Sequence, residues 1–167
     1  TTMPVPLAEA ASWDLEAIKK SAEVAAAEAA AEGINWTFAP MVDIGRDARW
    51  GRVMEGAGED PYLGSKIAVA RVKGFQGTNL SDNNTIAACA KHFAAYGAAQ
   101  AGRDYHSVDM SDRELREVYL PPFKAAIDAG AVSVMTAFND LNGIPATANP
   151  YLFQEILRDE WKFTGFV

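Results

Sequence analysis

Short apolar strands alternate with helices along this chain, and that alternation constrains the fold more than any other feature. The segments "TIAACAKHF" (85–93) and "AVSVMTAF" (131–138) are apolar at nearly every position, not only at every second one. Strands of this kind are buried on both faces, which is typical of parallel sheets, and parallel neighbours need a long connection such as a helix. The pattern therefore predicts an α/β protein built on a parallel sheet.

The predicted helices begin with standard signals. Ser12 is the predicted N-cap of the first long helix, and Asp60 and Asn149 are predicted N-caps that precede a proline. In "SDREL", Ser111 and Glu114 form a capping box, in which each side chain is expected to accept from the other's backbone N–H. The predicted helices span 12–33, 60–77, 111–129 (with a break at prolines 121 and 122) and 149–161, and the predicted strands span 34–43, 85–93, 131–138 and 165–167.

Two architectures contain such units, a closed (β/α)8 barrel and an open doubly wound sheet. The open sheet often carries a glycine-rich phosphate loop, and neither "GTNLSDNNT" nor "AGRDYHS" has that glycine spacing. The barrel is therefore favoured, and a complete barrel needs about 250 residues. We expect a partial (β/α)8 TIM-type barrel of about four β/α units, with residues 1–167 as a fragment of a single barrel domain that is incomplete at both ends.

Composition excludes several classes of partner. The net charge of −7 argues against nucleic acid or an anionic membrane surface, because both attract basic proteins. No apolar run approaches the roughly 20 residues that a membrane helix needs. The lone cysteine, Cys89, lies in an apolar run and is expected to be a buried, unreactive thiol. The two histidines, His92 and His106, lack the spacing of zinc ligands, so no metal site and no cofactor are expected.

Polar residues follow each predicted strand at its carboxyl end, which is where the sites of both α/β architectures lie. The first such loop carries three arginines, Arg46, Arg49 and Arg52, and several acids, among them Asp43, Glu55 and Glu59. These charges are expected to pair with one another, while one arginine turns into the site to bind an oxygen pair such as vicinal hydroxyls. The sequence does not say which arginine does so.

Lys91 and His92 end the strand at 85–93 and are expected to face opposite sides, because successive side chains alternate in a strand. A lysine there is costly to bury unless it is paired or used. Three roles stay open for Lys91: pairing with an acid, hydrogen bonding to a polar ligand, or forming a Schiff base, as in barrel aldolases. Met135 and Phe138, near the end of the next strand, are expected either in the core or as an apolar wall against a sugar ring.

Four blocks carry a resemblance to a known family: "NWTFAPMVDIGRDARWGRVMEGAGEDP", "ACAKHFAAYG", "VSVMTAFNDLNGIPATAN" and "LRDEWKFTGFV". In this order they closely resemble the first, barrel domain of glycoside hydrolase family 3, β-glucosidase type. The resemblance implies a retaining hydrolase that removes terminal non-reducing β-D-glucosyl residues from β-linked glucosides or oligosaccharides. It also favours a periplasmic or secreted location.

The resemblance assigns roles to individual residues. Arg52, Lys91 and His92 match family residues that bind hydroxyls of the sugar in the first subsite, and Arg103 matches an arginine that often joins them. Many members carry a tyrosine where this chain has Phe138, so a hydroxyl contact from this position is not expected. With Met135, these residues make up the expected substrate-binding set.

The same resemblance places the catalytic pair elsewhere. In the family, the strand that begins with "GFV" continues into Ser-Asp, so the nucleophilic aspartate is expected just beyond Val167. The acid/base carboxylate comes from much further along, usually from a second domain. Since a retaining glycosidase needs both carboxyl groups, about 5–5.5 Å apart, the 167 residues are expected to bind sugar but to be inactive alone. Their expected partners are the remaining segments of the enzyme, a second copy of the chain, or a chaperone that covers the open edges of half a barrel.

Two other functions stay open from the residues themselves. One is a lyase or aldolase half-barrel that uses Lys91 as a Schiff base. The other is a non-catalytic module that only binds sugar or takes part in assembly. Borohydride trapping with a carbonyl substrate distinguishes the lyase from a glycosidase.

Overall fold

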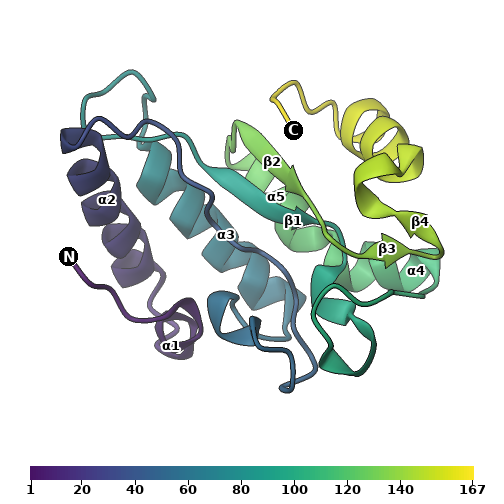
Figure 1. Cartoon of the computed structure of the whole chain (residues 1–167). Coiled ribbons are helices and arrows are strands. Elements are labelled where there is room, and N and C mark those ends of the chain that lie inside the picture. The colour runs from purple at the N-terminus through teal and green to yellow at the C-terminus, as the bar shows by residue number, and fades with distance from the viewer.

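The computed structural model describes all 167 residues and is a mixed α/β structure (Figure 1). Its helices are α1 (Pro6–Ala11), α2 (Leu15–Ala31), α3 (Pro61–Gln76), α4 (Asp112–Glu114) and α5 (Pro121–Asp128). Two further segments are π-helices, Leu115–Tyr119 and Tyr151–Glu160. Four short segments are 3-10 helices: Val53–Glu55, Tyr96–Ala98, Gln100–Gly102 and Ala146–Ala148. The strands are β1 (Cys89–Phe93), β2 (Ser133–Thr136), β3 (Asp140–Leu141) and β4 (Ile144–Pro145).

Parallel pairing joins successive strand segments, as the alternation of strands and helices predicts. Strand β1 pairs in parallel with β2, with Lys91 opposite Met135. Isolated parallel bridges join Met41 to Lys91 and Ser133 to Phe166, so neighbouring segments lie side by side in chain order. This confirms the parallel α/β pattern, whereas closure into a barrel stays a prediction. The small antiparallel hairpin of β3 and β4 was not predicted.

The predicted strand at 34–43 is largely irregular, and that expectation is wrong in its extent. Only Trp36 and Met41 form bridges, both parallel to the segment that contains β1. Pro40 has no N–H and cannot donate to a neighbouring strand. Its carbonyl still accepts a hydrogen bond from the Lys91 N–H at 3.1 Å, so the segment stays beside β1.

The predicted strand at 165–167 is also shorter than expected. Phe166 alone pairs, through a parallel bridge to Ser133, and its carbonyl accepts from the Val134 N–H at 3.1 Å. Val167 lies outside this bridge and is 51% exposed.

The helices pack against the strands in a row in which α3 lies between α2 and α5 (Figure 1). Gly74 permits the close approach of α2 and α3, because a Cβ atom there would lie 2.5 Å from the Lys19 carbonyl oxygen. Beneath the helices, Val72, Phe93 and Phe123 are fully buried in one continuous core. Cys89 is also buried, as expected, and burial raises the pKa of its thiol. None of the helices combines the length and the apolar character that a membrane-spanning helix requires.

The helix-start predictions hold in part. Asp60 caps α3 by accepting hydrogen bonds from the Tyr62 and Leu63 N–H groups at 2.7 and 3.1 Å. Ser12 is not the N-cap of α2, because the separate helix α1 precedes it and the Ser12 hydroxyl donates to a carbonyl of that helix. Asp14 caps α2 instead, accepting from the Ala17 N–H at 2.9 Å.

Asn149 and Ser111 are the other two predicted caps. The Asn149 side chain accepts from the Tyr151 N–H at 3.0 Å, which confirms the predicted cap. Of the capping box, only one half forms: the Ser111 hydroxyl accepts from the Glu114 N–H at 3.1 Å. The Glu114 carboxylate instead lies 3.3 Å from a guanidinium nitrogen of Arg46, because an ion pair competes for it. The helical course changes at the two prolines, since α5 begins at Pro121.

Candidate functional site

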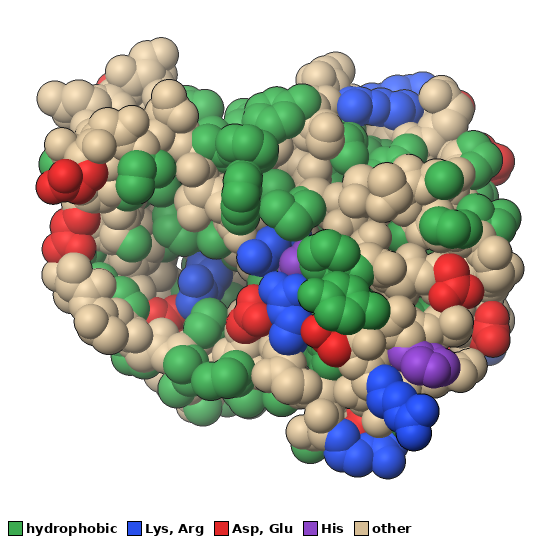
Figure 2. Space-filling view, viewed as in Figure 1, with side chains coloured by type: hydrophobic (Ala, Val, Ile, Leu, Met, Phe, Trp, Pro, Cys, Tyr) green, Lys and Arg blue, Asp and Glu red, His purple; other side chains and the backbone are tan.

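Polar and aromatic side chains from three loops meet at the carboxyl ends of the parallel segments. Lys91 and His92 lie near the carboxyl end of β1, Arg52 follows the segment that contains Met41, and Phe138 follows β2. The His92 and Phe138 rings lie 5.4 Å apart, and the Arg52 guanidinium lies 5.5 Å from the centre of the Tyr96 ring, which itself lies 5.1 Å from His92. Figure 2 shows blue, red and purple side chains gathered with green ones near the centre of this face. The structure thus brings together the loops that the sequence analysis singled out.

Arg52 is the arginine of its loop that lies in this cluster. It is partly buried and binds Glu55 through two hydrogen bonds, from Nε at 2.7 Å and from Nη2 at 2.9 Å. These bonds hold the pKa of Glu55 below its ordinary value, against the opposing effect of burial, and the charge of Lys91 lowers it further. Arg49 is instead exposed and pairs with Asp47 at 2.7 Å, outside the cluster.

The predicted pairing of the loop's acids with its arginines is right only for Glu55. Glu59 forms no ion pair. Asp43 binds His92 instead: its Oδ2 accepts from the His92 backbone N–H at 3.0 Å and lies 2.8 Å from His92 Nδ1. Asp43 ends its segment beside β1, so it lies nearer to His92 than to the exposed loop beyond.

His92 does not follow the alternation expected of a strand residue. The pairing of β1 with β2 shifts register between Lys91 and Phe93, so His92 lies in a bulge and the strand rule does not apply to it. The Lys91–His92 peptide bond is cis. His92 is buried, whereas Lys91 is partly exposed and forms no ion pair with any acid. Pairing with an acid, one of the three roles left open for Lys91, is therefore absent.

An aromatic wall borders the cluster. Phe138 is 52% exposed and lies 5.3 Å from Tyr96 and 5.2 Å from Tyr105, measured between ring centres. The Tyr96 hydroxyl donates to Asp104, which also accepts from Trp50 Nε1 at 3.0 Å. Burial, together with the bond to Asp104, raises the pKa of Tyr96. Sequence reasoning missed Tyr96, Tyr105 and Asp104, although all of them lie in the polar loop after β1.

For two predicted site residues, Arg103 and Met135, the structure shows no side-chain hydrogen bond or ion pair with the cluster. Arg103 is exposed, and its side chain makes no ion pair, although its backbone joins a turn with Gln100 and His106. Met135 lies in β2 opposite Lys91 and is partly buried. Their binding roles stay predictions. No three potential metal-ligating side chains lie together anywhere in the chain.

A model of the glycosyl hydrolase family 3 N-terminal domain matches residues 1–167. The chain belongs to this family. It is 48% identical over 165 residues to a periplasmic β-glucosidase of Salmonella typhimurium, a match that covers 99% of this chain and 22% of that protein. It is also 47% identical to a β-xylosidase of Formosa agariphila, a match that covers 100% of this chain and 24% of that protein.

A solved relative agrees in structure as well. A mutant β-glucosidase from Listeria innocua, in complex with laminaribiose, superimposes with a TM-score of 0.98 at 53% identity, over 100% of this chain and 24% of that one. The chain therefore spans less than a quarter of the length of these family 3 relatives. It corresponds to one segment of the N-terminal domain of these β-glucosidase-like enzymes.

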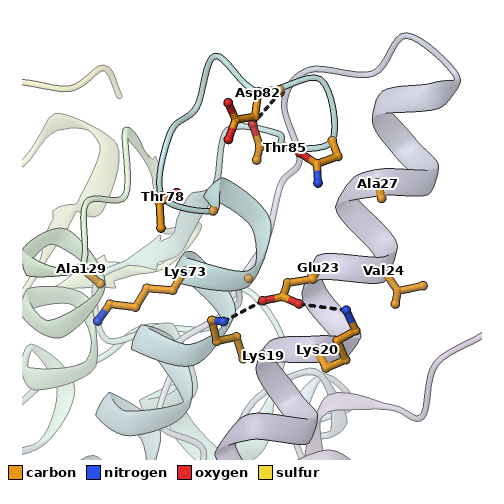
Figure 3. Close-up of a pocket in the computed structure, with 13 residues that line it drawn as sticks. Lys19, Lys20, Glu23, Val24, Ala27, Lys73, Thr78, Asp82, Thr85 and Ala129 are labelled. Carbon is orange, nitrogen blue, oxygen red and sulfur yellow. Dashed lines mark hydrogen bonds and ion pairs between the residues drawn. The ribbon is translucent and has the colours of Figure 1, made fainter.

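A groove of about 750 Å³ lies elsewhere, between α2, α3 and the loop that precedes β1 (Figure 3). Because this loop leads into β1, the groove lies at the opposite end of the strand from Lys91 and His92. Figure 3 shows Glu23 between Lys19 and Lys20, at 2.7 and 3.2 Å from their Nζ atoms. Glu23 therefore binds both lysines of this wall, and the groove contains none of the predicted site residues.

Proposed function

We propose that this chain is part of the (β/α)8 barrel of a retaining β-glucosidase and binds the terminal non-reducing β-D-glucosyl residue. The observation that carries the proposal is the convergence of Arg52, Lys91 and His92, beside Phe138, at the carboxyl ends of adjacent parallel segments. In barrel enzymes this end of the strands holds the active site. The β-glucosidases among the relatives support the same substrate class.

Each polar residue of the cluster offers the sugar a different kind of contact. Lys91 has an ammonium group without a carboxylate partner and donates to a hydroxyl oxygen. Glu55 occupies Nε and Nη2 of Arg52, so Nη1 is the nitrogen left for a sugar oxygen. A hydrogen bond that involves a charged group contributes about 1.5–3 kcal/mol. Exposed Phe138 supplies an apolar surface for the C–H face of the ring.

The catalytic carboxylates are assigned to parts of the enzyme outside these residues. A retaining mechanism needs one carboxylate as nucleophile and one carboxylic acid as acid/base. The three acids nearest the cluster are already engaged: Glu55 by Arg52, Asp43 by His92 and Asp104 by Tyr96 and Trp50. The chain therefore provides the first sugar subsite, and residues 1–167 are one part of a barrel domain.

The nucleophile is assigned to the position just beyond Val167. The segment that leads there runs parallel to β2, as the bridge from Phe166 to Ser133 shows. Parallel segments carry their carboxyl ends to the same edge of a sheet, so the chain after Val167 is directed toward the end at which Lys91 and Phe138 lie. This direction supports the assignment, and the acid/base is assigned to a further domain.

A β-xylosidase is the second candidate, because a relative of that name is 47% identical, close to the 48% of the β-glucosidase. The two sugars differ at C5, where glucose carries a hydroxymethyl group. The test is to measure kcat/KM of the complete enzyme on 4-nitrophenyl β-D-glucoside and on the matching β-D-xyloside. We expect the glucoside to be preferred. A preference for the xyloside would replace the proposed substrate, and hydrolysis of neither would overturn the proposed function.

A further inference from the structure

We propose that Asp43 is a positioning residue that fixes the His92 imidazole with its proton on Nδ1 and leaves Nε2 to accept a hydrogen bond from a sugar hydroxyl. The inference rests on the proposed function, because the ligand it names is the sugar of that site. It assigns to Asp43 a role that acts only through His92.

The contact between the two residues is sealed within the protein. Both side chains are 1% exposed, and Asp43 Oδ2 accepts from two atoms of the same residue, the His92 backbone N–H at 3.0 Å and Nδ1 at 2.8 Å. A carboxylate at this position accepts hydrogen bonds, so the bond to the ring places a hydrogen on Nδ1. The two contacts together fix the backbone of the bulge and the orientation of the ring.

The other ring nitrogen is left for a ligand. His92 Nε2 makes no hydrogen bond within the chain. The side-chain atoms that are both buried from solvent and without a hydrogen-bond partner are Asp43 Oδ1 and Asn139 Oδ1, so Nε2 is accessible to solvent. The rings of Tyr96 and Phe138 lie against the imidazole, with ring centres 5.1 and 5.4 Å from its centre. Nε2 therefore stays open while the rest of the residue is enclosed.

The carboxylate of Asp43 is not needed to hold its own segment beside β1. The Val42 N–H already donates to the Lys91 carbonyl at 2.8 Å, so the backbone joins the segments without Asp43. The carboxylate is also costly to bury, because its Oδ1 has no partner. A carboxylate buried at such a cost is explained by what it does to His92.

Two substitutions in the complete enzyme separate the positioning role from a structural one. Asp43→Leu removes both acceptors at similar volume, whereas Asp43→Asn keeps one oxygen to accept from His92. We expect the Leu variant to bind glucose about tenfold more weakly, as for the loss of one hydrogen bond of about 1.4 kcal/mol, and the Asn variant to stay within about threefold of wild type. The matched control is Asp47→Leu, an acid of the same loop that pairs with Arg49 outside the cluster.

A panel of monodeoxy glucoses identifies the hydroxyl through which Asp43 acts. His92→Ala should weaken every sugar except the one that lacks the hydroxyl bound by Nε2. Asp43→Leu should spare the same analogue, and the double variant should bind no more weakly than His92→Ala alone, since the two residues act as one unit. Equal losses for all analogues, or additive losses in the double variant, would overturn the proposal.

The ring itself supplies a readout that does not depend on turnover. In complete enzyme labelled with 15N-histidine, the His92 signals are those absent from the His92→Ala spectrum. We expect the hydrogen on Nδ1 in the wild type. A hydrogen on Nε2 instead of Nδ1 would overturn the proposal, even if Asp43→Leu fails to fold. This measurement needs no substrate. If the enzyme hydrolysed no β-glucoside, the proposed function would be wrong, but the position of the hydrogen on His92 would still test the role of Asp43.

Discussion

Arg52 binds Glu55 through two parallel hydrogen bonds, from Nε to Oε1 at 2.7 Å and from Nη2 to Oε2 at 2.9 Å. A guanidinium held in this way has a fixed plane, so its remaining nitrogen has a defined direction. The arrangement pre-orders one side of the proposed sugar site before any ligand arrives. It also makes the geometry of the site depend on the ionisation of Glu55.

The first prediction concerns acid stability. The pKa of Glu55 lies below its usual value of 4.5 in the folded protein, because Arg52 stabilises the carboxylate. The pair therefore contributes stability above about pH 4.5, and this contribution is lost as the pH falls through the lower, folded-state pKa. We expect Glu55→Gln to unfold at a lower temperature than wild type at pH 7, with a deficit below ~1 kcal/mol because the pair is partly exposed. A deficit that persisted unchanged at pH 3 would contradict this account.

A second prediction concerns Lys91, whose ammonium group has no acidic partner. In the complete enzyme, Lys91→Ala should lower kcat/KM on aryl β-glucosides by about 10- to 100-fold, through the loss of one charge-assisted hydrogen bond of roughly 1.5–3 kcal/mol. The matched control is Lys19→Ala on α2, which removes a lysine bound to Glu23 far from the cluster and should leave kcat/KM unchanged. Equal values for wild type and Lys91→Ala would mean that Lys91 has only a structural role. Borohydride treatment with a carbonyl substrate should leave Lys91 unmodified.

A third prediction tests the support of the aromatic wall. Asp104 accepts hydrogen bonds from the buried side chains of Trp50 and Tyr96, so Asp104→Ala leaves two buried donors without a partner. The expected loss of stability is about 1–3 kcal/mol, measured as a lower unfolding temperature, together with a raised KM as Tyr105 loses its position beside Phe138. The control is Asp109→Ala, an exposed acid of the same loop. If both variants unfold at the same temperature, Asp104 does not support the wall.

Much of the fold was predictable from local signals. The apolar segments at 85–93 and 131–138 predicted parallel neighbours, and β1 and β2 pair in that way. Asp60 followed by Pro61 marked the start of α3 correctly. Each of these signals depends on residues that are close in sequence, so a single amino-acid sequence is enough to recognise them.

The missed features depend on residues that are distant in sequence. Asp43 and His92 are 49 positions apart, and their bond exists because the two segments are neighbours and a bulge turns His92. Asp104 reaches Trp50 across 54 positions. Asp43 was expected to pair with an arginine of its own loop, and Asp104 was not singled out. Both were missed because the sequence shows charge but not which loops meet in space.

The last prediction is that these 167 residues alone hydrolyse no β-glucoside. Glu55, Asp43 and Asp104 each already bind another side chain, and the proposed nucleophile and acid/base lie outside these residues. The isolated chain also exposes the aromatic side chains of Phe38 and Phe166, which are 53% and 50% accessible and would be covered by a neighbouring segment in the proposed barrel. We expect no turnover of 4-nitrophenyl β-glucoside by the purified, folded chain, and turnover once the remaining segments of the enzyme are supplied. Turnover by the chain alone that disappears in Glu55→Gln would instead make Glu55 catalytic, and the catalytic carboxylates would then lie within this segment.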